Sequence, residues 1–335
     1  MRITGLFGGR NVVDRFILDG VRATLAECGD YEDRLFHVEG KPSDAEYIDI
    51  LAQTDVALIG WGTPRLPLGL LEHRPIRLRY VCNFTGAIRK LVPRQYLEAG
   101  IIVTNWGEEM MWYLAEANLM MILALTREIT KIRRHMQEGP QWHYDFAAPS
   151  PTLRRKTVAL VGIGGTGRLL LDLLAPFDCR LMAYDPYVEN LPPGVEHCTS
   201  LEALFDDADV VTVLCGLSEE TEGLIGRELL DRLGPNAIFI NTARGKIVRE
   251  SELVDFLTDR PDVFAGLDVF EQEPLAADSP LPRMDNVLCY PHCVVGGGDD
   301  MDCEIARHAA DNIRTFCAGG DPAGVITPEI YDHMT

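Results

Sequence analysis

The chain has 335 residues, of which 47% are hydrophobic, so its length and composition suit about two domains with packed cores. Its apolar runs are shorter than the roughly 20 residues that span a bilayer, and its formal charge of −20 argues against nucleic acid or a membrane surface as partner. The N-terminus lacks an apolar leader, and the nine cysteines include no CxxC pair. We therefore expect a cytoplasmic protein with reduced thiols.

The first hundred residues alternate between strand and helix patterns. Strands are predicted at residues 2–7, 34–38, 56–61, 78–82 and 101–104, and helices at 12–27, 43–53 and 93–99. Ser43 and Glu46 have the spacing of a capping box at the start of one helix. The alternation predicts a parallel sheet covered by helices. Because this part contains no dinucleotide fingerprint, we expect it to bind substrate.

A long apolar pattern follows from Met110 to about Met136 and predicts one helix. The pattern is apolar around more than one side, which is typical of a helix buried between neighbours. We expect an inter-domain core helix, with a dimer contact as the alternative.

The strongest motif lies in the middle of the chain. An apolar strand pattern at residues 157–161 leads into Gly162, Gly164 and Gly167 with the spacing GxGxxG, and a helical pattern follows at once. The first glycine permits a tight turn, the second lets the backbone approach a pyrophosphate, and the third lets helix and strand pack closely. The phosphates would then lie at the positive end of the helix. This context favours a dinucleotide site over an ordinary tight turn.

Asp185 indicates which dinucleotide is bound. It ends a second strand pattern, residues 180–184, and stands 18 residues beyond Gly167. A carboxylate at this place accepts hydrogen bonds from both ribose hydroxyls and repels a 2′-phosphate. The sequence therefore predicts NAD rather than NADP.

The rest of the chain continues the same alternation. Strands are predicted at 209–214, 237–241, 263–269 and 287–290, and helices at 200–205, 226–232, 251–257 and 302–318. The last helix is expected to return to the first domain. We therefore predict an α/β protein with two Rossmann-like, doubly wound parallel-sheet domains. A discontinuous, flavodoxin-like substrate domain comprises residues 1–108 and 297–335, and the NAD-binding domain comprises residues 109–296.

Three polar residues follow the ends of predicted strands in the second domain, where ligands of such sheets bind: Arg244, Glu273 and His292. An arginine matches a substrate carboxylate, a histidine can exchange the hydroxyl proton during hydride transfer, and a glutamate fixes the tautomer of that histidine. Individually they could be a surface charge, a solvated acid and a capped core histidine. Cys289 and Cys293 flank His292 without further ligands nearby, so we expect no metal.

These motifs together carry a family resemblance. Segments 161–167, 184–186, 240–245, 267–274 and 291–292 resemble the D-isomer-specific 2-hydroxyacid dehydrogenase family, most strongly over residues 100–300. The resemblance implies two Rossmann-like domains, NAD in the cleft and a homodimer. It makes Arg244 the substrate-binding arginine, His292 the acid/base and Glu273 its partner.

The cofactor residues combine the glycine motif with positions that the resemblance supplies. Gly165 and Thr166 match positions whose amides meet the pyrophosphate, and Asp268 matches a position near the nicotinamide amide. The predicted cofactor-binding residues are Gly162, Gly164, Gly165, Thr166, Gly167, Asp185, Leu214, Cys215, Thr221, Thr242, Ala243 and Asp268.

The sequence departs from the family in a substrate-facing loop. Where relatives have a Gly-Val-Gly-like loop followed by Asp, this chain reads Thr85, Gly86, Ala87, Ile88 and Arg89. The predicted substrate contacts are Thr85, Gly86, Ala87 and Arg89, together with Arg244. For Arg89 the alternatives are a surface charge and a contact to a second anionic or polyhydroxyl part of the substrate.

Two further departures indicate a divergent branch. Leu214 and Gly216 replace a common histidine and proline, and residues 106–110 differ from a Pro-Gly-x-Asn-like segment. The main hypothesis is an NAD-dependent oxidoreductase that interconverts a D-2-hydroxy acid and its 2-oxo acid. The alternatives are an NAD(H)-sensing protein like the C-terminal-binding-protein corepressors, and a formate- or phosphite-type dehydrogenase.

Overall fold

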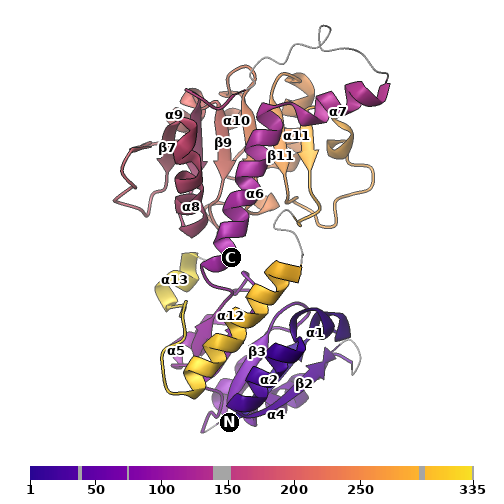
Figure 1. Ribbon diagram of the computed structural model, residues 1–335, viewed down its shortest axis with the longest axis vertical. Helices are drawn as coiled ribbons and strands as arrows, with labels where there is room; N and C mark the ends of the chain where they lie inside the picture. The colour runs from indigo at the N-terminus through magenta and orange to yellow at the C-terminus, as the bar shows by residue number, and fades with distance from the viewer. Residues whose placement is uncertain (37–39, 74, 139–151, 294–298, 334–335) are drawn as a thin grey trace. The chain divides into compact units, whose positions relative to one another are not determined.

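The computed structural model describes residues 1–36, 40–73, 75–138, 152–293 and 299–333. The chain divides into two compact units (Figure 1). Unit 1 comprises residues 1–110 and 296–335, and unit 2 comprises residues 111–295. The second boundary predicted from the sequence, at residues 296 and 297, lies outside the described residues. No helix in the described ranges is both long and apolar enough to cross a bilayer.

Unit 1 contains a five-stranded, wholly parallel sheet in the order β2-β1-β3-β4-β5. This is the flavodoxin-like order, so the predicted fold of this domain is confirmed. Strands β3 and β4 are buried along their whole length and β1 at every residue after Arg2, which is typical of a parallel sheet covered on both faces. The bounds are β1 (Arg2–Phe7), β2 (Asp30–Leu35), β3 (Val56–Ile59), β4 (Tyr80–Asn83) and β5 (Ile102–Thr104).

The helices of unit 1 come from both ends of the chain. Figure 1 shows the C-terminal α12 beside α2, and the two helices are in contact. The capping box is confirmed, because the Ser43 side chain accepts from the Glu46 amide and the Glu46 side chain accepts from the Ser43 amide. The bounds are α1 (Arg10–Phe16), α2 (Asp19–Cys28), α4 (Asp44–Ala52), η1 (Leu68–Glu72), α5 (Arg94–Glu98), α12 (Asp299–Cys317) and α13 (Pro328–His333).

Two predictions in unit 1 are wrong in detail. The single helix predicted at residues 12–27 is two helices, because Ile17 leaves the helical region and Leu18 is extended as the N-cap of α2. The strand predicted from Arg34 begins at Asp30 instead, and residues 37 and 38 of that prediction lie outside the described residues. β2 is an edge strand, and its polar residues do not form the apolar pattern from which a strand is predicted.

Unit 2 contains a seven-stranded parallel sheet in the order β12-β11-β10-β9-β6-β7-β8. This is the dinucleotide-binding strand order with one further strand, β12, at one edge. The polar loop predicted after Asp185 contains β8, an edge strand with only one apolar residue, Val195. The bounds are β6 (Thr157–Val161), β7 (Arg180–Tyr184), β8 (Val195–His197), β9 (Val210–Val213), β10 (Ile238–Asn241), β11 (Phe264–Leu267) and β12 (Val287–Cys289).

The long helix predicted from Met110 to Met136 is also two helices. Glu128 adopts a φ of 49°, a left-handed conformation that ends the first helix, and the second begins one residue later. The bounds in and before unit 2 are α6 (Glu109–Thr126), α7 (Ile129–Glu138), α8 (Gly165–Leu174), η3 (Ala175–Phe177), α9 (Leu201–Asp207), α10 (Arg227–Leu230), η4 (Gly245–Ile247), α11 (Glu250–Asp259) and η5 (Leu281–Arg283).

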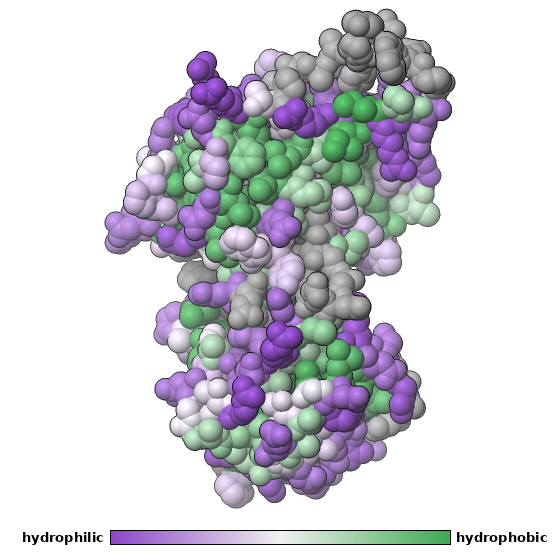
Figure 2. Space-filling view, in the orientation of Figure 1, coloured by the Kyte–Doolittle hydropathy of each residue, from purple (hydrophilic) through white to green (hydrophobic). Residues whose placement is uncertain are grey.

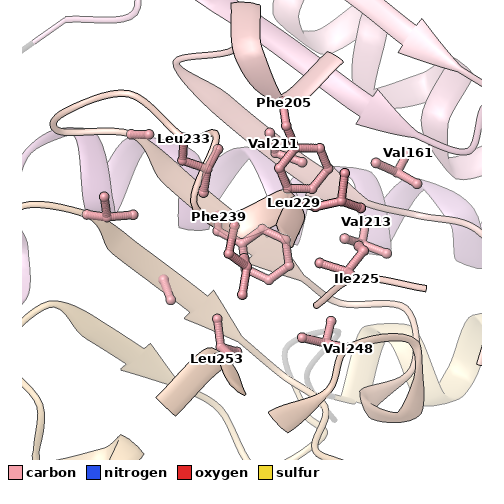
Figure 3. Packing of buried hydrophobic residues seen from close by; sticks show 14 of the residues in the cluster. Val161, Phe205, Val211, Val213, Ile225, Leu229, Leu233, Phe239, Val248 and Leu253 are labelled. Carbon is pink, nitrogen blue, oxygen red and sulfur yellow. The ribbon is translucent and has the colours of Figure 1, made fainter. Parts of the chain in front are cut away.

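Apolar clusters on both faces of this sheet fix its central strands. Phe205 and Phe239 are fully buried on one face, with ring centroids 6.5 Å apart, and Val161, Val211 and neighbouring residues surround them (Figure 3). A second cluster, packed with residues of α6 and α8, covers the other face. Because the strands are held from both sides, the loops at their carboxyl ends begin from fixed points.

Candidate active site

The glycine turn forms where β6 and β9 bring two loops together. Gly162 has a φ of +92°, and a Cβ on it would lie 2.7 Å from the backbone nitrogen of Cys215. Only glycine fits this conformation and this approach. Helix α8 begins after Gly164 without a side-chain cap, so amides at its N-terminus are free of a capping side chain. These features suit the pyrophosphate of a dinucleotide.

Asp185 closes the glycine turn from the end of β7. One carboxylate oxygen accepts from the Ile163 amide at 2.9 Å, and the other accepts from the Tyr187 amide at 3.0 Å. A carboxylate has about four acceptor sites. Asp185 therefore retains capacity for ribose hydroxyls while it holds the loop that would carry the phosphates.

The loop after β9 carries three of the predicted cofactor residues. The Leu214 amide donates to Val161 O at 2.8 Å, and the Thr221 hydroxyl donates to Gly216 O at 2.7 Å. Burial raises the pKa of the Cys215 thiol to about 12. A raised pKa disfavours a thiolate nucleophile at Cys215.

Arg244 lies in a turn that hydrogen bonds with neighbouring residues stabilise. The Asn241 side chain accepts from the Ala243 amide at 3.1 Å and donates to Arg244 O at 3.0 Å. The Arg244 guanidinium donates to Ala243 O at 2.6 Å. Burial lowers the pKa of Arg244, opposed by the charge of Glu273. An arginine remains charged even so, so this turn presents a partly desolvated cation next to an acid.

His292 and Glu273 form a direct pair. His292 Nδ1 lies 2.7 Å from Glu273 Oε2, and Glu273 Oε1 accepts from the Phe270 amide at 3.1 Å. An ionised carboxylate only accepts hydrogen bonds, so Nδ1 carries the hydrogen and Nε2 is left for a ligand. Half of the His292 side chain is exposed, at 50%. The pair is therefore oriented and accessible to a small molecule.

The backbone of His292 is held by Asp268. His292 has a φ of 52°, its amide donates to Asp268 O at 2.8 Å, and the Cys293 amide donates to the Asp268 carboxylate at 2.8 Å. Asp268 is only 3% exposed. The family resemblance implies a position near the nicotinamide amide for Asp268, which stays a prediction, and the structure shows its contacts to the His292 turn.

The predicted substrate loop belongs to unit 1 and is organised by a residue that the sequence analysis missed. The Asn83 amide nitrogen donates to Thr85 O and Ala87 O, each at 3.0 Å, and Asn83 Oδ1 accepts from the Thr85 amide and hydroxyl. A Cβ on Gly86 would lie 2.4 Å from the Trp106 ring. Thr85 is buried with its hydroxyl already bonded, and Arg89 is exposed.

The structure thus brings the three predicted catalytic residues together in unit 2. They follow the carboxyl ends of the neighbouring strands β10, β11 and β12. Asn83 and Asn241 could have been found from the sequence, because each is an asparagine that ends an apolar strand and precedes a turn. Among the described residues, no group of three or more histidine, cysteine or acidic side chains is placed to hold a metal ion.

The first prediction concerns Asp268. Replacing it with alanine removes the acceptor for the Cys293 amide, and we expect a loss of about 1.5–3 kcal/mol in the free energy of unfolding, as for a hydrogen bond to a charged group. Asp268→Asn keeps an oxygen at the same place and should lose clearly less. Denaturant unfolding of both variants measures the difference, and equal losses would contradict the anchoring role.

Comparison with known proteins adds relatives of the whole chain. A glyoxylate reductase of Thermofilum pendens is 30% identical over 328 residues, which cover 95% of this chain and 94% of that protein. A D-isomer specific 2-hydroxyacid dehydrogenase from Xanthobacter autotrophicus Py2, solved with NADPH and MES, superposes with a TM-score of 0.73 at 25% identity and covers 98% of each chain. An acyclic imino acid reductase solved with NADPH and D-Arg shares the fold, with a TM-score of 0.79 at 22% identity over 97% of this chain and all of that one.

The family model for the NAD binding domain of D-isomer specific 2-hydroxyacid dehydrogenases matches residues 119–294. This match includes the glycine turn, Asp185 and the three predicted catalytic residues. Together with the full-length relatives, it shows that the chain belongs to the D-isomer specific 2-hydroxyacid dehydrogenase family and is an oxidoreductase with an NAD binding domain.

Proposed function

We propose that Arg244 binds the substrate carboxylate and that His292, oriented by Glu273, transfers the hydroxyl proton. The observation that carries this proposal is the 2.7 Å contact between His292 Nδ1 and Glu273 Oε2, which leaves Nε2 free of that carboxylate. Gly245, next to Arg244, packs against the backbone of Phe270, where a Cβ would lie 1.9 Å from the Phe270 carbonyl carbon, and the Phe270 amide donates to Glu273. The arginine turn therefore adjoins the loop that carries Glu273. The geometry supports hydride chemistry on an acid that carries a neighbouring carbonyl or hydroxyl group.

The chain's own residues then have distinct tasks. A bound nicotinamide supplies or accepts the hydride at the substrate's C2 carbon. In the direction of reduction, Arg244 neutralises the carboxylate of the 2-oxo acid and polarises its carbonyl, and protonated His292 gives its proton to the carbonyl oxygen. Glu273, in contact with Nδ1, fixes the orientation of the imidazole ring for that transfer. Oxidation of the hydroxy acid reverses these steps, and the proton returns to His292.

The second prediction tests His292 directly. General acid and base groups contribute about 10²- to 10⁴-fold to rates, so His292→Ala should lower kcat by about that factor. Binding of NADH, measured by fluorescence titration, should stay within about twofold, because the glycine turn and Asp185 are unchanged. Glu273→Gln keeps a polar group beside Nδ1 and should give a smaller loss. Turnover of His292→Ala at the wild-type rate would refute the assignment.

We also propose that the chain prefers NAD over NADP because of the Asp185 charge. The two solved relatives described above were both crystallised with NADPH, so this preference requires its own test. The charge of the Asp185 carboxylate is the basis of this preference, since a carboxylate beside the ribose repels the 2′-phosphate of NADP.

The third prediction tests this cofactor preference with two variants of Asp185, one that keeps its contact to the glycine turn and one that removes it. Asp185→Asn removes the charge and keeps an acceptor for the glycine turn, and it should raise the ratio of kcat/KM for NADPH to that for NADH by about tenfold, or 1.4 kcal/mol. Asp185→Ala also removes the acceptor, and it should in addition weaken NADH binding. Equal use of NADPH and NADH by the unmodified protein would contradict the proposal.

We further infer a cytoplasmic homodimer. All nine cysteines are free thiols, as expected in a reducing compartment. Ile129, Ile132 and Met136 are 51%, 39% and 56% exposed, and their spacing places them on one side of α7. Figure 2 shows apolar residues at the surface on this part of unit 2. An exposed apolar stripe of this kind is typical of a protein interface, and a second copy of the chain is the partner that we propose.

The fourth prediction concerns this stripe. Ile132→Asp places a charge in the proposed interface, and it should shift a dimer toward monomer by at least tenfold in the dimer dissociation constant, measured by sedimentation equilibrium. Arg133→Asp, on the neighbouring exposed position, is the matched control and should change the constant much less. A monomeric unmodified protein, or equal effects of the two variants, would contradict the proposal.

The substituent of the 2-oxo acid is suggested by two features of unit 1. Trp61, 42% exposed just beyond β3, stacks on Phe16 with centroids 4.8 Å apart and packs edge-on against Phe84. This exposed ring favours an apolar substituent. Arg89 favours an anionic or polyhydroxyl one, although its charge also acts on Tyr331 of α13. Kinetics with 2-oxo acids of both kinds, on the unmodified protein and on Arg89→Ala, discriminate between them.

A further inference from the structure

A buried polar cluster connects helix α6 to the ends of β9 and β10. Asn118 of α6 is fully buried, as is Thr212 of β9, and Thr242 follows β10. The Asn118 amide nitrogen donates to Leu114 O at 2.8 Å and to the Thr242 hydroxyl at 2.9 Å. Its carbonyl oxygen accepts from the Thr212 hydroxyl at 2.8 Å and lies 3.1 Å from the Thr242 hydroxyl.

The amide of Asn118 uses its whole hydrogen-bonding capacity. A side-chain amide has two N–H donors and an oxygen with two lone pairs, and all four have partners here. Burying such a group is costly unless its partners are in place, so a complete set fixes the positions of the partners. Thr126 is another buried polar residue of α6, and within the ranges that the structure describes its hydroxyl bonds only to Ile122 O of its own helix. Asn118 is therefore placed to act on residues outside its helix.

The partners of Asn118 lie beside the residues that carry the proposed chemistry. Thr242 stands two positions before Arg244. The side chain of Asn241 bonds to the backbone of Ala243 and Arg244 in the same turn. Thr212 lies in β9, next to β10, and β9 leads into the loop of predicted cofactor residues that starts at Leu214. The hydrogen bonds of Asn118 to Thr242 and Thr212 join segments 124 and 94 positions apart in the sequence.

We propose that Asn118 is a positioning residue for the reaction, which acts on Arg244 through Thr242. The buried amide holds the Thr242 hydroxyl, Thr242 sets the start of the turn, and Asn241 completes it, so the guanidinium keeps one orientation toward the substrate carboxylate. This inference rests on the proposed role of Arg244. It assigns no contact with substrate or cofactor to Asn118 itself.

The fifth prediction separates positioning from general stability. Asn118→Ala should raise the KM for the 2-oxo acid about tenfold, and it should change the Kd for NADH much less. Thr126→Val removes a buried hydroxyl from the same helix at nearly constant volume, and it should leave both constants unchanged. Thermal unfolding of both variants shows whether their losses of stability are comparable. If Thr126→Val raises KM as much as Asn118→Ala at equal stability, the positioning role is refuted.

A double-mutant cycle with Arg244→Lys completes the test. If Asn118 acts through Arg244, Asn118→Ala should add less than twofold to the KM of the Arg244→Lys variant, whereas an independent structural defect should add its full tenfold. Should Asn118→Ala fail to fold, Asn118→Leu removes the same polar contacts while it fills most of the same space, with the same expectation. If Arg244→Lys alone leaves KM unchanged, the proposed role of Arg244 fails. If Arg244→Lys impairs the enzyme and the effects are fully additive, only the role of Asn118 fails.

Discussion

The candidate active site of unit 2 depends on one constraint. The parallel strands of this unit are buried on both faces of their sheet. Strands β6, β9 and β10 have apolar clusters on either side, so their carboxyl ends are fixed and the loops that follow start at one edge. At this edge the chain reverses the direction in which strands are added, between β6 and β9. Such a point leaves a crevice for a ligand. The close approach of Gly162 to Cys215 lies there.

Within that framework, polar side chains hold the backbone turns that carry the proposed catalytic residues. Asn241 holds the turn of Arg244, and Asp268 holds the turn of His292. Glu273 contacts the histidine ring directly, and its other oxygen accepts from a backbone amide. This arrangement lets the acid/base pair remain half-exposed to solvent without losing its orientation, which suits a site that a small acid must enter and leave.

Much of the fold followed from sequence because its signals are local. The glycine turn, the apolar strands and the strand-helix alternation each lie within short segments, and the residues at strand ends predicted Arg244, Glu273 and His292 as neighbours. The breaks at Ile17 and Glu128 were missed because one residue's backbone angles end a helix without changing the apolar pattern. The role of Asn118 was also missed. Its partner Thr242 is 124 positions away, so only the folded chain reveals the contact.

We expect this chain to reduce 2-oxo acids stereospecifically. The most direct measurement follows NADH oxidation by the unmodified protein against a panel of 2-oxo acids with small, aromatic, dicarboxylic and sugar-derived substituents, and determines the configuration of each product. We expect NADH consumption with at least one member, a product of D configuration, and reverse reaction with the D- but not the L-hydroxy acid. Tight NADH binding without oxidation by any 2-oxo acid would contradict it and favour an NAD(H)-sensing protein.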